Sequence, residues 1–348
     1  MPAAISQVNG HTEMMYVGAT PWHGLGVKLD NPATAEEAIQ AAHLDWEVVQ
    51  RPVFLQRRED HPDRTELTKL VLERIEGRQA VQRVDTGEVF GVFSDGYTLL
   101  QNRDAFKFFD GVVGEGQAIY HTAGALAGGK RIWMLAKLPG ELKVTNRDVL
   151  EKYVLLANSH DGSLAVHMKL TPIRVVCQNT LFAALEGGRH AQEFYTVHRG
   201  GLQSRLVEAR EVLGLSDAYF ARVMEGVEAL VKAPMLQEAL DLFLWDIYKL
   251  DPAKLLAAQP PVKAAAYAQT LQLFEAGRGQ DDPETRGTAW AAYNAVVEYT
   301  DYYQPLGLGL KSLGDGSPAV QGKRLNRAWF GTGAQLKRDA WAKLLASV

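Results

Sequence analysis

The chain contains a single cysteine, Cys177, among its 348 residues. One thiol cannot form a disulfide within a chain, and it cannot build a zinc site from several cysteines. No apolar run approaches the roughly 20 residues of a membrane-spanning helix, so we expect no membrane contact. The first residues lack the charged start and apolar stretch of a secretory signal. These absences favour a cytoplasmic protein.

The sequence also lacks the short motifs of common nucleotide-dependent enzymes. Neither Gly128-Gly-Lys130 nor Gly309-Leu-Lys311 has the spacing of a phosphate-binding loop. The chain has no dinucleotide fingerprint after its first predicted strand, no nucleophile elbow and no paired-histidine zinc helix. We therefore expect neither a cofactor nor a metal centre.

The net charge of −4 is unevenly distributed along the chain. Residues 1–120 and 211–310 each have a formal net charge of −7, whereas residues 121–210 and 311–348 each have a formal net charge of +5. The segment 121–210 also holds five of the nine histidines. A basic zone in an acidic chain indicates a surface for an anionic partner, although chance variation of solvated faces is the alternative.

Alternating apolar residues predict strands through most of the first 198 residues, and helical spacing dominates afterwards. We predict an α+β fold: an antiparallel, β-rich domain with a few helices over 1–198, then a mainly helical region over 199–348. The predicted strands span 46–56, 68–76, 80–84, 88–93, 117–122, 131–137, 153–157 and 164–170. The predicted helices span 34–43, 102–112, 175–185, 202–213, 218–232, 236–249, 262–274, 290–303 and 335–344.

The stretch 158–180 crowds polar residues between two apolar runs. These polar residues are Asn158, His160, Asp161, Arg174, Cys177 and Asn179. Burying such groups without partners costs about 1–3 kcal/mol each, so their place beside the core marks a site. We predict that all except Cys177 meet in one polar cluster. Simple hairpin geometry favours the alternative of two sites, because the turn would lie roughly 20 Å from Pro172.

His160, Asp161 and Arg174 also suit an enzyme. An aspartate beside a histidine can orient the imidazole as a general base, and an arginine can clamp an anionic group. The alternative is structural, because Asp161-Gly162 is an ordinary hairpin turn. Cys177 suits a nucleophile, yet a cysteine on an apolar helix face is more often buried and inert. Whether the protein is an enzyme is left open.

Basic and aromatic residues interleave in the predicted strands of the basic segment. Single nucleic-acid strands are commonly held by cations that contact phosphates and by aromatic rings that stack on bases. We predict phosphate contacts from Lys130, Arg131, Lys137, Lys169 and Arg174, and stacking from Tyr120, Trp133 and Tyr153. The alternative is that these rings fill the core, as aromatic residues in strands often do.

Motifs along nearly the full length resemble one family. They are Thr20-Pro-Trp-His-Gly-Leu-Gly26, Phe93-Ser-Asp-Gly-Tyr97 with Gln101-Asn102, Asn158-Ser-His-Asp-Gly162, Arg174-Val-Val-Cys-Gln-Asn-Thr-Leu181, Trp290-Ala-Ala-Tyr-Asn294 and Trp329-Phe-Gly331. In combination they resemble the phage- and plasmid-borne family known as domain of unknown function 932, in its phage/plasmid-like branch. The resemblance implies a mobile element in a bacterial cytoplasm and assigns no activity. A fainter similarity, at the level of fold, is to single-strand annealing proteins related to Rad52.

The leading hypothesis is a cytoplasmic phage or prophage protein that binds single-stranded DNA as a homo-oligomer and promotes annealing. Trp22 and His23 of the first motif join Asn158, His160, Asp161 and Asn179 as candidate site residues. One alternative is an enzyme that uses His160, Asp161 and Arg174 on a small substrate or nucleic acid. Another is a host-takeover or structural interaction protein that docks through its helical half.

Overall fold

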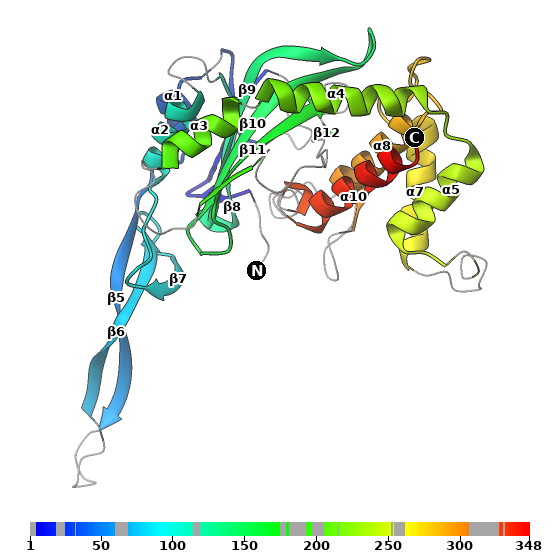
Figure 1. Cartoon of the computed structure of the whole chain (residues 1–348). Coiled ribbons are helices and arrows are strands. Elements are labelled where there is room, and N and C mark those ends of the chain that lie inside the picture. The colour runs from blue at the N-terminus through cyan, green and yellow to red at the C-terminus, as the bar shows by residue number, and fades with distance from the viewer. Residues whose placement is uncertain are drawn as a thin grey trace.

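A curved β-sheet forms the centre of the molecule, with helices on one face and a helical layer beside it (Figure 1). A long two-stranded arm projects away from this body. The computed structural model describes residues 5–18, 25–31, 33–59, 69–113, 119–174, 179–180, 193–196, 205–214, 216–251, 253, 262–305, 327–329 and 331–348. All structural statements below concern these residues.

The central sheet has eight strands in the order β12-β11-β10-β9-β8-β3-β4, and β13 also pairs with β11. Its strands are β3 (Met14–Val17), β4 (Val27–Leu29), β8 (Ile119–Leu126), β9 (Arg131–Lys143), β10 (Val149–Ser159), β11 (Val166–Arg174), β12 (Asn179–Thr180) and β13 (Glu193–Thr196). The pairs are antiparallel except for β3 with β4, which is parallel. A small separate hairpin joins β1 (Gln7–Val8) and β2 (His11–Thr12).

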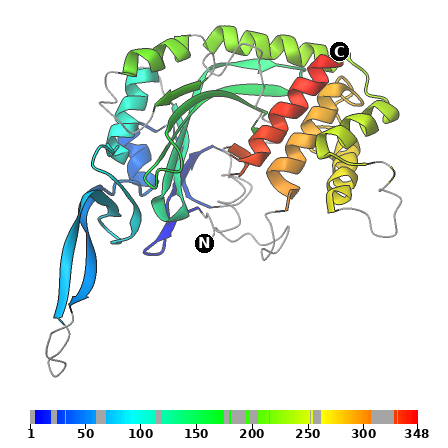
Figure 2. The same ribbon diagram turned by 60° about the horizontal axis from the view of Figure 1, so that its bottom comes forward.

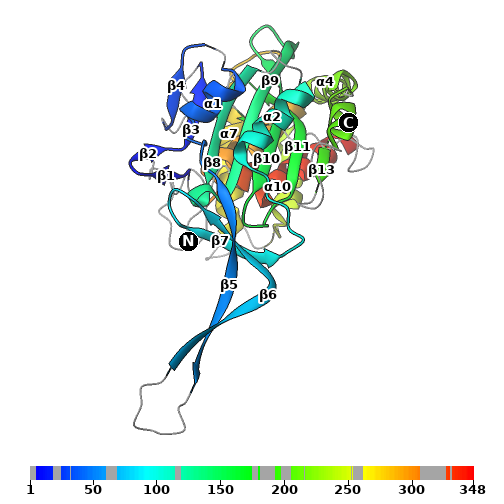
Figure 3. The same ribbon diagram turned by 90° about the vertical axis from the view of Figure 1, so that its left-hand side faces the viewer.

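The arm is built from β5 (Val48–Glu59) and β6 (Lys69–Arg83), and β7 (Val89–Ser94) pairs with the inner part of β6. The predicted strands 80–84 and 88–93 therefore form an antiparallel hairpin. The predicted strands 68–76 and 80–84 are parts of one strand, because a bulge that includes Gly77, with a φ of +73°, carries β6 through without a break. Figure 3 shows the arm extending well beyond the body of the molecule.

The helices follow the sequence pattern closely. They are α1 (Ala35–Ala41), α2 (Asn102–Val113), α3 (Leu206–Gly214), α4 (Ser216–Lys232), α5 (Gln237–Tyr248), α7 (Val262–Ala276), α8 (Ala289–Glu298), which continues as a π-helical turn (Tyr299–Tyr303), and α10 (Thr332–Ala346). A short 3₁₀ turn (Ala127–Gly129) precedes β9. A capping box begins α1, since Thr34 and Glu37 exchange hydrogen bonds. The α+β class, with a β-rich first half and a mainly helical second half, is confirmed.

The predicted helix over 175–185 is wrong where the structure describes it. Asn179 and Thr180 form strand β12, which pairs with Arg174 and Ile173 at the edge of β11. A short apolar run does not separate helix from strand by its periodicity. Here the unpaired backbone groups of the β11 edge select the extended form. Residues 175–178 and 181–185 lie outside the described residues.

The sheet has two differently covered faces, because successive residues of a strand point to opposite sides. The outer face carries residues such as Tyr120 and Met134 and lies under α1, α2 and α4 (Figure 2). The inner face carries Trp133, Tyr153 and Leu155, against which Trp329 packs. The outer-face core continues without a break into the helical layer of α5, α7, α8 and α10. No helix among the described residues has the length and apolar character needed to cross a membrane.

Candidate functional site

Three of the five predicted basic residues lie on the inner face of the sheet. Arg131 and Lys137 alternate with Trp133 along β9, so they share its face. Lys169 on β11 lies opposite Leu155, which also belongs to this face. All three cations are partly exposed. The register of the strands thus brings together cations that are 38 residues apart in the chain.

A polar network, His121, Lys137, Glu151 and Tyr153, lies on the same inner face. The Lys137 ammonium donates to Glu151 Oε1 at 2.5 Å, and the Tyr153 hydroxyl donates to Glu151 Oε2 at 2.6 Å. The hydroxyl also lies 3.3 Å from His121 Nδ1. Sequence reasoning missed His121 and Glu151, because nothing in the pattern shows that a bulge in β8 and the β10 register place them beside Tyr153.

Burial and pairing set the charges of this inner-face network. Burial alone would raise the pKa of Glu151, but hydrogen bonds from Lys137 and Tyr153 outweigh it and lower that pKa. Burial, with the neighbouring Glu151 carboxylate, raises the pKa of Tyr153. Burial also lowers the pKa of His121, which favours its neutral form. At neutral pH the network therefore holds one Lys–Glu ion pair, a neutral tyrosine and a neutral imidazole.

Tyr153→Phe should destabilise the protein more at neutral pH than at acidic pH. A carboxylate whose pKa is lowered by folding stabilises the native state above its unfolded pKa and loses that contribution as pH falls through the folded pKa. Removing the hydroxyl removes one of the donors that lower the pKa of Glu151. Denaturant unfolding of both proteins at pH 7 and pH 3 measures the difference, and a pH-independent difference would contradict the role given to Glu151.

The three aromatic residues predicted to stack on bases are buried. Tyr120 faces α2, where its hydroxyl donates to Asp110 at 2.6 Å. Trp133 is 1% exposed and meets the Trp329 ring edge-on at 4.9 Å between centroids. Tyr153 is also 1% exposed. These rings are buried in the core, so they offer no face to a base.

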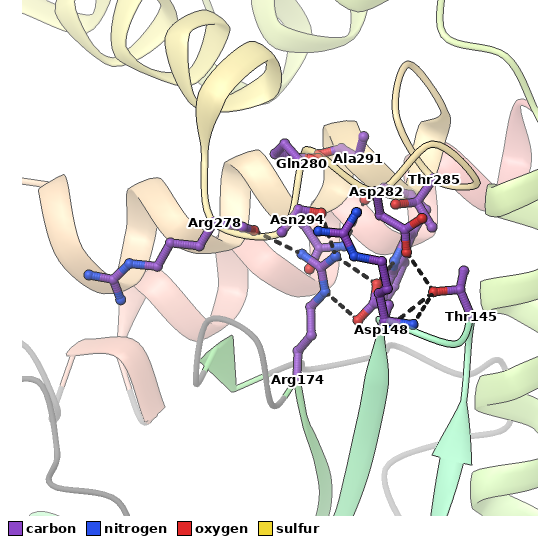
Figure 4. A network of polar contacts seen from close by, with 12 residues as sticks. Thr145, Asp148, Arg174, Arg278, Gln280, Asp282, Thr285, Ala291 and Asn294 are labelled. Atoms are coloured by element: carbon purple, nitrogen blue, oxygen red, sulfur yellow. Dashed lines mark hydrogen bonds and ion pairs between the residues drawn. The ribbon is translucent and has the colours of Figure 1, made fainter.

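Lys130 and Arg174 also differ from the prediction. Lys130 lies outside the strand, with its ammonium 3.2 Å from Glu88. Arg174 is 1% exposed, so it cannot reach a phosphate in solvent. It donates to both oxygens of Asp148 at 2.7 and 2.6 Å and reaches the carbonyl of Gly279 at 3.2 Å (Figure 4). The fork of the guanidinium joins the sheet to the loop before α8 instead of clamping a ligand.

The predicted cluster of His160 and Asp161 with Arg174 does not form within the chain. Arg174 pairs with Leu150 at one end of β10, and His160 follows the other end of that strand. Ten residues of extended strand span about 33 Å, so the two groups form separate sites. Asn179 lies beside Arg174 in the register, far from Asn158. Catalysis shared between His160 and Arg174 of one chain is excluded by this separation.

His160 and Asp161 have structural partners. The His160 ring is 1% exposed, and its Nε2 lies 2.9 Å from Asn102 Oδ1. Asp161 accepts hydrogen bonds from the backbone N–H and the hydroxyl of Ser163, as a turn aspartate does. His160 therefore links the end of β10 to α2, and Asp161 stabilises the turn that follows β10.

Two of the six motifs, Phe93–Tyr97 with Gln101-Asn102 and Asn158–Gly162, meet at the root of the arm. The Gln101 side chain bonds the N–H and the carbonyl of Val48, the first residue of β5, at 3.0 and 2.8 Å. Tyr97 donates to the carbonyl of Ser159 at 3.4 Å. A Cβ at Gly162 would lie 2.6 Å from the Phe93 ring, so only glycine fits there. Trp22, His23 and Cys177 lie outside the described residues, so their predicted roles stay predictions.

Comparison with known proteins places the chain in a family. A family model described as "Domain of unknown function (DUF932)" matches residues 89–330. The chain belongs to this family. The DUF932 match contains the inner-face network and the Arg174–Asp148 ion pair, whereas the arm strands β5 and β6 precede it.

Two curated relatives of this DUF932 protein come from Escherichia coli (strain K12). UPF0380 protein YfjQ is 34% identical over 110 residues, and UPF0380 protein YafZ is 33% identical over 107 residues. Each alignment covers 30% of this chain and 37% of the relative. No solved structure matches the chain. These matches lend no support to the fainter similarity to annealing proteins. Among the described residues, no group of three or more His, Cys, Asp or Glu side chains could hold a metal ion.

Proposed function

We propose that this DUF932 protein binds single-stranded DNA on the inner face of its sheet and acts in phage or prophage recombination. One observation carries the proposal: the strand register gathers Arg131, Lys137 and Lys169 on a single face. His121, of the inner-face network, and His167, which lies opposite Ala157 of that face, add ring nitrogens to it. These residues belong to the segment with a balance of +5 in an otherwise acidic chain.

The spacing of the cations suits an extended phosphate backbone. Lys137 lies six positions after Arg131 on β9, about 20 Å along the strand. Lys169 lies two strands away from Lys137, roughly 10 Å across the sheet. Lys137 pairs with Glu151 at 2.5 Å, and the Arg131 guanidinium donates to Ser163 Oγ at 2.9 Å.

The proposed contact is with phosphates and not with bases. Since Tyr120, Trp133 and Tyr153 are buried, stacking on them contributes nothing. Contacts to phosphates alone do not distinguish one base sequence from another, and the affinity that they give falls as the salt concentration rises. A single strand bends easily onto a curved face, whereas a duplex stays stiff over about 150 base pairs. The proposal therefore favours single strands over duplexes.

Lys169→Gln should weaken binding of an oligothymidylate several-fold and make its salt dependence shallower by about 0.7 in log–log slope. The matched control is Lys152→Gln, because Lys152 lies on β10 but faces outward over the Phe220 ring of α4. Its replacement should leave DNA affinity unchanged. Fluorescence anisotropy with a labelled oligonucleotide measures both variants. Equal losses in the two variants, or none in Lys169→Gln, would contradict the placement on the inner face.

A further inference from the structure

The inner-face network fixes which ring nitrogen of neutral His121 carries the hydrogen. The Glu151 carboxylate is ionised at neutral pH, because its pKa is lowered, so it can only accept hydrogen bonds. The Tyr153 hydroxyl, 2.6 Å from Glu151 Oε2, therefore donates its one hydrogen to that oxygen. The same hydroxyl lies 3.3 Å from His121 Nδ1 and can meet this nitrogen only as an acceptor. The hydrogen of neutral His121 is thus on Nδ1, and Nε2 keeps its lone pair.

The Nε2 atom of His121 is accessible to a ligand. It has no hydrogen-bond partner in the part of the chain that the structure describes. Gly18, which follows β3, lies beside this nitrogen without bringing a side chain to it, since a Cβ there would be 3.9 Å from Nε2. The side chains of His121, Lys137 and Glu151 are all partly exposed. A ligand on the inner face can therefore reach Nε2.

Charged groups on two other strands of the sheet act on His121. Burial has the largest effect and lowers its pKa, the Glu151 carboxylate of β10 raises it, and the Lys137 ammonium of β9 lowers it. The hydroxyls of Tyr153 on β10 and Tyr16 on β3, which lies opposite Thr122, are the titratable groups beside them. At neutral pH one ammonium and one carboxylate cancel in the inner-face network. Protonation of His121 therefore gives the network a net positive charge.

We propose that His121 is a proton-dependent phosphate contact of the inner face. The oxygens of a phosphodiester carry no hydrogen, so they cannot bond to the lone pair of a neutral Nε2. When His121 is protonated, Nε2–H donates to a phosphate oxygen, and a positive charge assists the bond. Single-stranded DNA then binds more tightly at acidic pH than at neutral pH. This inference rests on the proposed function, because it adds one contact and its regulation to the same face.

Proton binding and DNA binding are reciprocal. If the protonated protein binds a strand better, then the bound strand raises the pKa of His121 by the same free energy. The affinity for DNA increases as pH falls through the pKa of the bound form, by at most about tenfold per pH unit for one proton. The increase levels off below the pKa of the free form, which lies under the ordinary value of about 6.5.

Fluorescence anisotropy with a labelled oligothymidylate, at constant ionic strength from about pH 7.5 to about pH 5, measures this linkage. The wild-type protein should bind several-fold more tightly at the acidic end. His121→Gln should lose most of that gain, because glutamine does not titrate. His43→Gln is the matched control, since exposed His43 follows α1 on the other side of the sheet, and it should keep the gain. His167 is present in all three proteins, so its own titration cancels. An equal gain in His121→Gln and the wild type overturns the proposal.

Nitrogen NMR of the full chain tests His121 without DNA. Its signals are those that disappear in His121→Gln, and their shifts tell a protonated ring nitrogen from an unprotonated one. Nδ1 should carry the hydrogen at neutral pH, and Tyr153→Phe should lose that preference. A neutral ring protonated on Nε2 overturns the proposal. If no strand binds at any pH, the proposed function fails, and inorganic phosphate then tests His121 alone. Phosphate should raise the pKa of His121, and an unchanged pKa overturns the inference.

Discussion

Asp148→Ala is expected to lower the free energy of unfolding by about 3–5 kcal/mol. Asp148 is 1% exposed and accepts two hydrogen bonds from the buried Arg174 guanidinium and one, at 2.9 Å, from the indole nitrogen of Trp290. Removing the carboxylate leaves a buried cation without the anion that pairs with it. Urea unfolding followed by tryptophan fluorescence measures the loss.

The neighbouring surface pair is the control for Asp148. Arg147 precedes it in the chain and pairs with Asp281, and the two side chains are 58% and 73% exposed. Exposed pairs contribute little, because water already solvates both charges. Arg147→Gln should therefore leave the unfolding curve almost unchanged. Similar losses in the two variants would show that Arg174 and Asp148 do not form a buried joint.

Glu13→Gln is expected to lower the free energy of unfolding by about 3 kcal/mol. Glu13 and Arg83 are buried, with Arg83 Nη2 2.5 Å from Glu13 Oε1, and the guanidinium lies 4.1 Å above the Trp46 ring. This pair ties the end of β6 to the chain before β3, so it fixes the root of the arm. Thermal and urea unfolding measure the effect.

Asp85 offers the matched comparison for Glu13. It contacts the same guanidinium at 2.6 Å, but its side chain is 39% exposed. The hydrogen bond from Arg83 lowers the pKa of Asp85, and solvent replaces much of that interaction when it is lost. Asp85→Asn should lower the free energy of unfolding clearly less than Glu13→Gln does. The reverse order would show that burial does not govern this cluster.

Local signals in the sequence predicted the elements well. The Thr34–Glu37 capping box begins α1, and alternation around Gly87 predicts the β6–β7 hairpin. These features depend on neighbours within a few residues, which the sequence displays directly. Fold class follows from the same signals, because strands occupy the first half and helices the second.

Long-range partners could not be predicted from the pattern. Arg174 pairs with Asp148, which lies 26 residues earlier in the chain, and its guanidinium lies 5.7 Å from the Trp290 ring of α8. Nothing near Arg174 in the sequence distinguishes an arginine that clamps a ligand from one that joins two layers. The same limit applies to Trp133, whose burial depends on Trp329. The sequence therefore predicted the strands of this region but not which of their side chains are buried.

The sequence located the motif around His160 but did not reveal its role. Its crowding of polar residues did mark a special place, the arm root, where Gly162 leaves room for Phe93 and His160 meets Asn102. The spacing alone gave no reason to prefer this structural role over catalysis. Only the β9–β10 register and the position of α2 reveal it.

The salt dependence of single-strand binding tests the central proposal most directly. With about three phosphates neutralised, log affinity should fall against log salt with a slope of about −2, roughly 20-fold between about 50 and 200 mM. A duplex of the same length should bind more weakly at every salt concentration. Absence of affinity for any single strand at low salt, or an affinity that salt does not change, would contradict the proposal.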